Sequence, residues 1–447
     1  MAEIKFTKST EEVSLINADD QPIETTTGLN VFTTCLFIVG VIAGSGFLTL
    51  PKAIDDSGWI GFVLILFCCF VSAYTGDILG KCWIMVVNRH PEFDKAKLRY
   101  PYPTIGQEAF GKWGRFVVSF SINFTQFGGT VVYILLAAEN IVTLLPSDTK
   151  ITCCYIALIV GAAMTPFTWL GTPKDFWGIA AAATLATSIA SVILFAAVLY
   201  NGREVDISEV THTKVDVITF FTAYGTICFA FNGHPAFPTF QSDMANPRKF
   251  GRALILGYLI VLFMYLPSSA AGYAVYGSQV QPNVLNTIPK GVTSTLVSLL
   301  MTAHLLFGII IVINPVSQEL EHFINIPEHF TWKRVLARTI TMASALFVVA
   351  SVPHFSSILS LVGGSTISIL AFICPCLFYL KLCRGDKDRE PVHIPLHTKV
   401  LLYEIIFTGF VAGIAATYSA ITDLAVNKFT VPCYVDPSRA CSQQAAG

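Results

Sequence analysis

The sequence predicts an all-helical membrane protein that crosses the bilayer many times. Hydrophobic residues make up 53% of the 447 residues and charged residues only 13%, against about 25% charged in soluble proteins. The mean hydropathy is +0.63. Long apolar runs follow one another along the chain, and the basic residues gather in alternate connecting segments. Together these features exclude a soluble globular protein.

Eleven runs are long enough to span a membrane, which takes roughly 20 apolar residues. They lie at about 31–53, 59–82, 116–145, 151–170, 176–200, 217–242, 253–275, 292–316, 335–352, 355–380 and 400–422. The third run is long enough to tilt. The ninth is the weakest, because it is short and carries Arg338 near its start.

The basic residues orient the chain. With the N-terminus in the cytoplasm, 21 of the 28 Lys and Arg residues fall in cytoplasmic segments, as the positive-inside rule requires. We therefore expect three regions. Residues 1–28 form a disordered cytoplasmic tail, residues 29–425 the transmembrane domain, and residues 426–447 an extracellular or lumenal tail.

Most of the twelve cysteines lie inside apolar runs, where cysteine behaves as a small hydrophobic residue. Cys433 and Cys441 are different, because they lie in the polar C-terminal tail. We expect them to form a disulfide if this tail faces an oxidising compartment.

Two spans carry helix-breaking sequences near mid-membrane. The first contains VGVIAGSGFLTLP and the sixth contains FAFNGHPAFPTFQ. Glycine and proline weaken a helix, and unpaired backbone persists in a membrane only where it lines a cavity or is buried in protein. Packing glycines and an ordinary proline kink would explain either motif alone. The two lie five spans apart, however, and an odd offset inverts the topology, so they occupy equivalent positions in two inverted halves, which is typical of a transporter site.

The breaks suit a zwitterion. Half-helix N-termini offer free N–H groups to a carboxylate, and unwound carbonyls accept hydrogen bonds from an ammonium group. Nearby aromatic side chains would select the substrate's side chain. The candidate substrate-binding residues are Ile42, Gly44, Ser45, Gly46, Phe47, Tyr133, Phe231, Asn232 and Gly233.

Three motifs carry a family resemblance. IAGSGFLTLPKA followed by SGW, RYPYPTIGQEAFG, and FNGHPAFPTFQSDMANPRKF resemble, in order, segments of the amino acid/auxin permease family of transmembrane amino acid transporters. The similarity extends over residues 28–422, and the vesicular, vacuolar and proton-coupled branches are the most similar. The resemblance implies a leucine-transporter-like fold with an inverted 5+5 repeat plus one extra helix. It also implies secondary active transport of amino acids, which we expect to be small and neutral, by alternating access.

The coupling ion is left open by the resemblance, and we prefer the proton over sodium. His234, His304 and Glu139 are ionisable residues inside spans, where such residues are functional candidates. Alternatively, His234 is neutral and donates a hydrogen bond to a carbonyl that the break leaves unpaired, and Glu139 has a structural role. For sodium, the fold uses carbonyls of span one and hydroxyls of span eight, and Thr302 is the candidate.

The N-terminal tail contains EEVSLI, which matches an acidic dileucine sorting signal at Glu11, Leu15 and Ile16. It favours a lysosomal, vacuolar or vesicular membrane over the plasma membrane, with sorting adaptors as partners. The net charge of −1 predicts no nucleic-acid partner. No catalytic motif, cofactor motif or cluster of metal ligands is evident, so we expect no enzyme. A transporter-like amino acid sensor remains the alternative.

Overall fold

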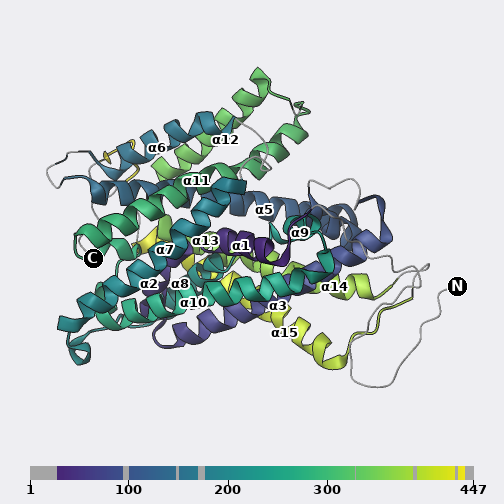
Figure 1. Cartoon of the computed structure of the whole chain (residues 1–447), viewed down its shortest axis with the longest axis horizontal. Coiled ribbons are helices and arrows are strands. Elements are labelled where there is room, and N and C mark those ends of the chain that lie inside the picture. Colours follow the sequence, from purple (N-terminus) through teal and green to yellow (C-terminus); the bar gives the residue numbers. More distant parts are fainter. Residues whose placement is uncertain are drawn as a thin grey trace.

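The computed structural model describes residues 28–93, 100–146, 149, 151–169, 177–327, 329–385, 390–427 and 431–437. Within these residues the chain is helical and has no strand. One isolated parallel bridge joins Leu29 to Met244. The long helices lie roughly along one common direction (Figure 1). This arrangement confirms the all-helical membrane fold.

The helices of the first half, as described, follow the expected spans one to five. They are α1 Val31–Ile42, α2 Gly46–Ser57, α3 Ile60–Arg89, α5 Pro101–Leu144, α6 Cys153–Thr168 and α7 Trp177–Asn201. The chain between α7 and α8 contains the short 3-10 turns Gly202–Glu204 and Ile207–Glu209.

The second half repeats this order. Its described helices are α8 Val217–Ala230, α9 Phe237–Ser242, α10 Phe250–Tyr276, α11 Val292–Phe323, α12 Trp332–Ser351, α13 Phe355–Val362, a π-helical stretch Gly363–Ile373, and α14 Cys374–Cys383. α15 Leu396–Thr422 follows as the extra helix, with the π-helical turn Asp423–Asn427 at its end. The remaining 3-10 turns are Pro247–Lys249, Gly277–Gln279 and Val284–Asn286.

The two halves begin in the same way. α1 and α8 each start with a capping box, Asn30 with Thr33 and Asp216 with Thr219. In both, the cap side chain accepts a 2.8 Å hydrogen bond from the backbone N–H three residues on, which satisfies an amide left free at the helix start. Equivalent local chemistry thus starts the first helix of each repeat.

Eight described helical segments are long and apolar enough to cross a membrane, and the bent pair of α1 and α2 makes nine. α6 and α8 are apolar but shorter, and they coincide with the fourth and sixth expected spans. The expected total of eleven spans stays a prediction. The chain is a multi-pass membrane protein.

The third expected span begins earlier than predicted. α5 starts at Pro101 and has non-helical backbone at Phe110 and Gly111, where Gly111 has φ 64°. Proline at a first helical position is favourable, because it lacks an N–H that would be unpaired there. Part of the connection between the expected second and third spans is therefore a short helix that kinks into the third span.

The expected Cys433–Cys441 disulfide is wrong. Cys433 is bonded to Cys154, with 5.7 Å between their Cα atoms, and Cys441 lies outside the described residues. The Cys433 amide also donates to the Ala350 carbonyl (2.7 Å), and the Tyr434 ring stacks on that of Phe347. Cys154 lies in the first turn of α6, so it can reach a tail on the same side of the membrane. The bond fixes residues 431–437 to the ends of α6 and α12.

This pairing gives a direct test. In denatured, non-reduced protein, Cys154→Ser should expose one new thiol to a maleimide-PEG gel shift, because Cys433 loses its partner. Cys441→Ser should expose none. If Cys441→Ser instead frees a thiol while Cys154→Ser does not, the bond assigned here is absent.

Candidate functional site

Both predicted helix breaks are present. α1 ends at Ile42 and α2 begins at Gly46, with a bend of 57° between them. α8 ends at Ala230 and α9 begins at Phe237. Both breaks are largely buried: Ser45, Phe47 and His234 are all 0% exposed.

The breaks pack crosswise against each other. A Cβ added to Gly46, at the start of α2, would lie 2.5 Å from Ala230 Cα, at the end of α8. A Cβ added to Gly233 would lie 3.0 Å from Ile42 Cγ1, at the end of α1. The start of α2 therefore contacts the end of α8, and the segment before α9 contacts the end of α1. At Gly46 only a residue without a side chain allows this approach.

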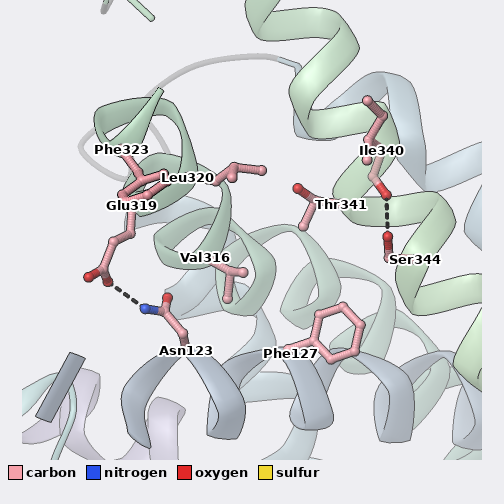
Figure 2. A pocket seen from close by; sticks show the side chains of 9 residues that line it. All are labelled: Asn123, Phe127, Val316, Glu319, Leu320, Phe323, Ile340, Thr341 and Ser344. Atoms are coloured by element: carbon pink, nitrogen blue, oxygen red, sulfur yellow. Dashed lines mark hydrogen bonds between the residues drawn. The ribbon is translucent and has the colours of Figure 1, made fainter. Parts of the chain in front are cut away.

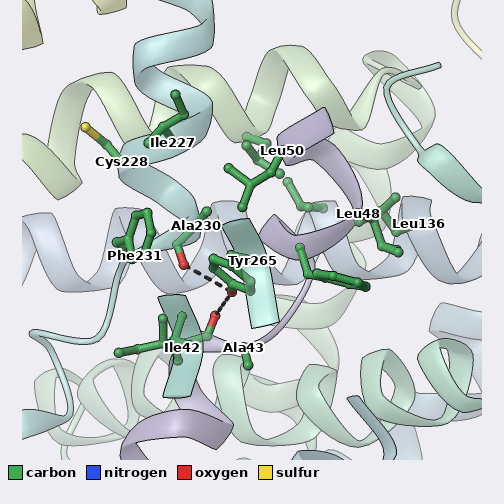
Figure 3. Packing of buried hydrophobic residues seen from close by; sticks show 14 of the residues in the cluster. Ile42, Ala43, Leu48, Leu50, Leu136, Ile227, Cys228, Ala230, Phe231 and Tyr265 are labelled. Carbon is green, nitrogen blue, oxygen red and sulfur yellow. Dashed lines mark hydrogen bonds between the residues drawn. The ribbon is translucent and has the colours of Figure 1, made fainter. Parts of the chain in front are cut away.

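Two tyrosines of α10 satisfy the carbonyls at the broken ends. Tyr265 Oη lies 2.7 Å from the Ile42 carbonyl and 3.3 Å from the Ala230 carbonyl, and Figure 3 shows it between the two. Tyr258 Oη donates to the Phe231 carbonyl (3.1 Å). Ile42 O also accepts from the Gly44 amide (2.8 Å). The carbonyls of Ile42 and Phe231, expected to face an ammonium group, therefore have protein partners here.

Two backbone donors stay free at the first break. Within the described part of the chain, the amides of Ser45 and Gly46 donate to no backbone carbonyl, whereas Gly44 donates to Ile42. Both free amides lie at the start of α2, where the helix dipole is positive. The arrangement can bind a carboxylate.

Aromatic rings surround the first break. Phe47 stacks on Tyr265 with centroids 6.1 Å apart. The Tyr133 hydroxyl would lie 2.6 Å from a Cβ at Gly44, and the Tyr133 ring packs where a Cβ of Gly308 would be, 2.4 Å away. Tyr133 and Phe47 are thus brought together with Gly44–Gly46, as the sequence analysis expected.

The second break contributes Phe231 and Asn232. Phe231 is 0% exposed, and its ring lies 5.5 Å from that of Tyr265. Asn232 Oδ1 is buried and has no hydrogen-bond partner among the described residues. It is an acceptor available to a ligand's ammonium or hydroxyl group.

His304 of α11 faces the first break. Its Nδ1 lies 3.1 Å from the Ala183 carbonyl and 2.8 Å from Thr187 Oγ1, both on α7. A carbonyl only accepts, so Nδ1 carries a hydrogen and neutral His304 keeps its lone pair on Nε2. That Nε2 would lie 3.3 Å from a Cβ at Gly44. α11 and α7 thus aim a proton acceptor at the end of α1.

His234 lies on the second break but is turned towards α3. Its Nε2 is 3.0 Å from Thr75 Oγ1, and its ring packs 5.0 Å from that of Phe237. Nδ1 is buried without a hydrogen-bond partner in the described chain. The two candidate histidines therefore occupy different environments.

Glu139 and Thr302 each have hydrogen-bond partners outside the two breaks. Asn283 and Asn286 offer their amide groups to Glu139 Oε2, 3.4 and 3.5 Å away. Thr302 Oγ1 donates to the Ser298 carbonyl of its own helix (2.7 Å). No group of three or more metal-ligating side chains occurs in the described residues. The proposed sorting residues Glu11, Leu15 and Ile16 lie outside them.

A separate groove of about 390 Å³ opens between α5, α11 and α12. Figure 2 shows Asn123 Nδ2 donating to Glu319 at its edge (2.5 Å). Phe323 and Ile340, which also line it, are 82% and 53% exposed. No residue of either break lines it, so this groove is not the site formed by the broken helices.

Sequence reasoning missed Tyr258, Tyr265 and Thr187. The tyrosines are spaced seven residues apart, which places them on one face of α10. This spacing identifies the tyrosines as partners of the breaks only when one also knows that the carbonyls at the breaks need hydrogen-bond donors.

Known proteins match the whole membrane domain. The family model described as "Transmembrane amino acid transporter protein" matches residues 27–422. Amino acid transporter AVT1D of Arabidopsis thaliana is 27% identical over 398 residues, covering 86% of this chain and 68% of the relative. Amino acid transporter AVT1J of the same organism is 25% identical over 404 residues, covering 88% and 90%.

Solved structures show the fold. A Na+-coupled sialic acid symporter is 13% identical with a TM-score of 0.54, covering 89% of this chain and 90% of that one. The manganese transporter of Eremococcus coleocola is 12% identical with a TM-score of 0.55, covering 95% of both chains. The fold is thus the leucine-transporter-like fold expected above. By the family match over nearly its full length, the chain belongs to the transmembrane amino acid transporter family.

Proposed function

We propose that the chain is a proton-coupled secondary transporter that moves small, neutral amino acids by alternating access. The observation that carries the proposal is the crosswise packing of two broken helices with unpaired Ser45 and Gly46 amides between them. These donors suit the substrate carboxylate, and Asn232 Oδ1 offers an acceptor on the second break. Ile42 O is occupied twice, so we assign the ammonium group to Asn232 instead.

The side chains at the breaks support a neutral substrate. Residues 42–47 and 230–237 contain no Asp, Glu, Lys or Arg. A charged substrate side chain would lose its hydration there without gaining an ion pair, which is costly. The close approach of Tyr133 to Gly44 and Gly308 limits the room for a large one.

The surroundings of His304 support the proton as the coupling ion. Nε2 faces the C-terminal end of α1, where the helix dipole is negative and favours a cation. His234 precedes the N-terminal end of α9, where the dipole opposes positive charge. We therefore assign the proton to His304 Nε2, and His234 to the structural role of holding the break against Thr75.

We place the protein in a lysosomal, vacuolar or vesicular membrane. The Cys154–Cys433 disulfide needs an oxidising compartment on one side. The EEVSLI motif supplies an adaptor-binding signal on the opposite side.

Uptake of radiolabelled amino acids into proteoliposomes tests the function. With a proton gradient imposed, we expect concentrative uptake of small neutral amino acids, and with a sodium gradient alone we expect none. Binding without movement under either gradient would favour the sensor. Uptake driven by sodium alone would overturn the coupling assignment.

Gly46→Ala should reduce uptake about 10- to 100-fold, because the new methyl group overlaps Ala230 and overpacking costs about 1–3 kcal/mol. Initial uptake rates in proteoliposomes measure it. Gly178→Ala is the matched control, since a Cβ there meets nothing within 4 Å. Equal rates for the two variants would show that the crosswise contact does not matter for transport.

His304→Gln should abolish proton-driven accumulation while retaining exchange of labelled for unlabelled substrate, because glutamine hydrogen-bonds but does not titrate. His234→Gln should still accumulate substrate under the proton gradient. Accumulation by the His304 variant together with its loss in the His234 variant would reverse the assignment.

A further inference from the structure

A segment of the chain between α7 and α8 joins α2 to α10. We call residues 210–213 the strap. The Thr211 carbonyl accepts from the Ser278 amide (2.8 Å), just beyond the end of α10. Two residues on, the Thr213 amide donates to Asp55 Oδ1 of α2 (3.2 Å), and the Thr213 hydroxyl donates to Oδ2 of the same carboxylate. The strap therefore connects the second half-helix of the first break with the helix that holds both breaks.

His212 lies between these two anchor points. Its ring stacks on Tyr273 of α10 with centroids 4.2 Å apart. Its Nδ1 is 3.5 Å from Asp55 Oδ1. The His212 side chain is 37% exposed, whereas the Asp55 side chain is 0% exposed. Protons from solution can thus reach the imidazole, while its carboxylate partner is shielded from water.

The charged side chains that α2 brings near His212 are Lys52, Asp55 and Asp56. Lys52 of α2 lies 3.1 Å from Asp55 and 3.0 Å from Asp56, so one ammonium group faces two carboxylates. α10 contributes the phenol of Tyr273 and no charge to the contact. The strap region itself carries Glu209 and Lys214 on either side, which are of opposite sign. An imidazolium at His212 would add a second cation beside the buried Asp55 carboxylate.

The strap lies on the same side of the membrane as the disulfide. Cys154 begins α6, and the chain crosses in α6 and returns in α7 before it enters the strap. A disulfide forms in an oxidising compartment, so His212 faces a lumen or the exterior.

We propose that His212 is a proton-sensing residue, whose protonation adds an ion pair to the Thr213–Asp55 hydrogen bonds, tightens the strap on α2 and favours the state closed on the disulfide side. The ion pair with Asp55 forms only when the imidazole is charged. It is present when the imidazole is protonated and is lost when the proton leaves. Acidification of this compartment therefore shifts the population towards opening on the cytoplasmic side. This last step rests on the proposed transport function.

Spin labels on Glu209→Cys and Trp59→Cys test the strap without any substrate. Glu209 directly precedes the strap, and Trp59, 70% exposed, lies two residues beyond the end of α2. In nanodiscs we expect a narrow distance distribution at pH 5.5 and a broad one, with a longer component, at pH 7.5. An identical distribution at the two pH values would overturn the proposal.

Variants of the pair sharpen the test. His212→Gln should give the broad distribution at both pH values, and His212→Lys the narrow one at both, because lysine stays charged. Asp55→Asn should also remove the response, whereas His90→Gln should keep it, since His90 contacts Glu92 and Glu108 elsewhere. A pH response that survives in His212→Gln would assign it to another group. If the wild-type protein takes up no amino acid in proteoliposomes but keeps the pH response of the spin labels, the result contradicts the proposed transport function and leaves the role of the strap intact.

Discussion

The hydrogen bonds from Tyr265 and Tyr258 to the broken helix ends are the interactions on which the architecture depends. A carbonyl without a partner in the membrane interior costs several kcal/mol, and each break releases several of them. One hydroxyl, on Tyr265, serves the ends of both α1 and α8. α10 therefore fixes the two breaks relative to each other, and glycines at the contacts allow them to meet.

The hydrogen bonds already made at the two breaks decide which groups a ligand can use. The Ile42 carbonyl has two protein partners, and the Phe231 carbonyl has one. Among the described residues, the amides of Ser45 and Gly46 and the Asn232 side-chain carbonyl have no hydrogen-bond partner. The unused groups include both donors and an acceptor, which is the complement that a zwitterion needs. A substrate that binds them would complete the hydrogen bonding that the helices leave unfinished.

The helix breaks were predictable because glycine and proline act locally on the backbone. The GSG and GHP motifs lie where the helices end, and the apolar runs locate most spans to within a few residues. The partners of the breaks were not predictable, since Tyr265 and His304 reach them from distant helices and no local pattern marks such contacts. The disulfide was mispaired for a related reason. Cys433 was matched with the nearest tail cysteine, although the predicted orientation already placed the start of span four, with Cys154, on the same side.

The two ends of the broken helices are held by different contacts, which bears on the proposed alternating access. On the N-terminal side, the backbone of Leu29 pairs with Asp243 and Ala245, joining the start of α1 to the end of α9 through uncharged amides. On the disulfide side, α2 is tied through a carboxylate and an exposed imidazole. Amide bonds do not respond to pH between about 5 and 8, whereas imidazoles do. Under the proposed role of His212, a pH difference across the membrane acts on the closure at the disulfide side. In the proposed transport cycle, this one-sided control shifts the populations of the two states, whereas net flux is driven by the proton that crosses with the substrate.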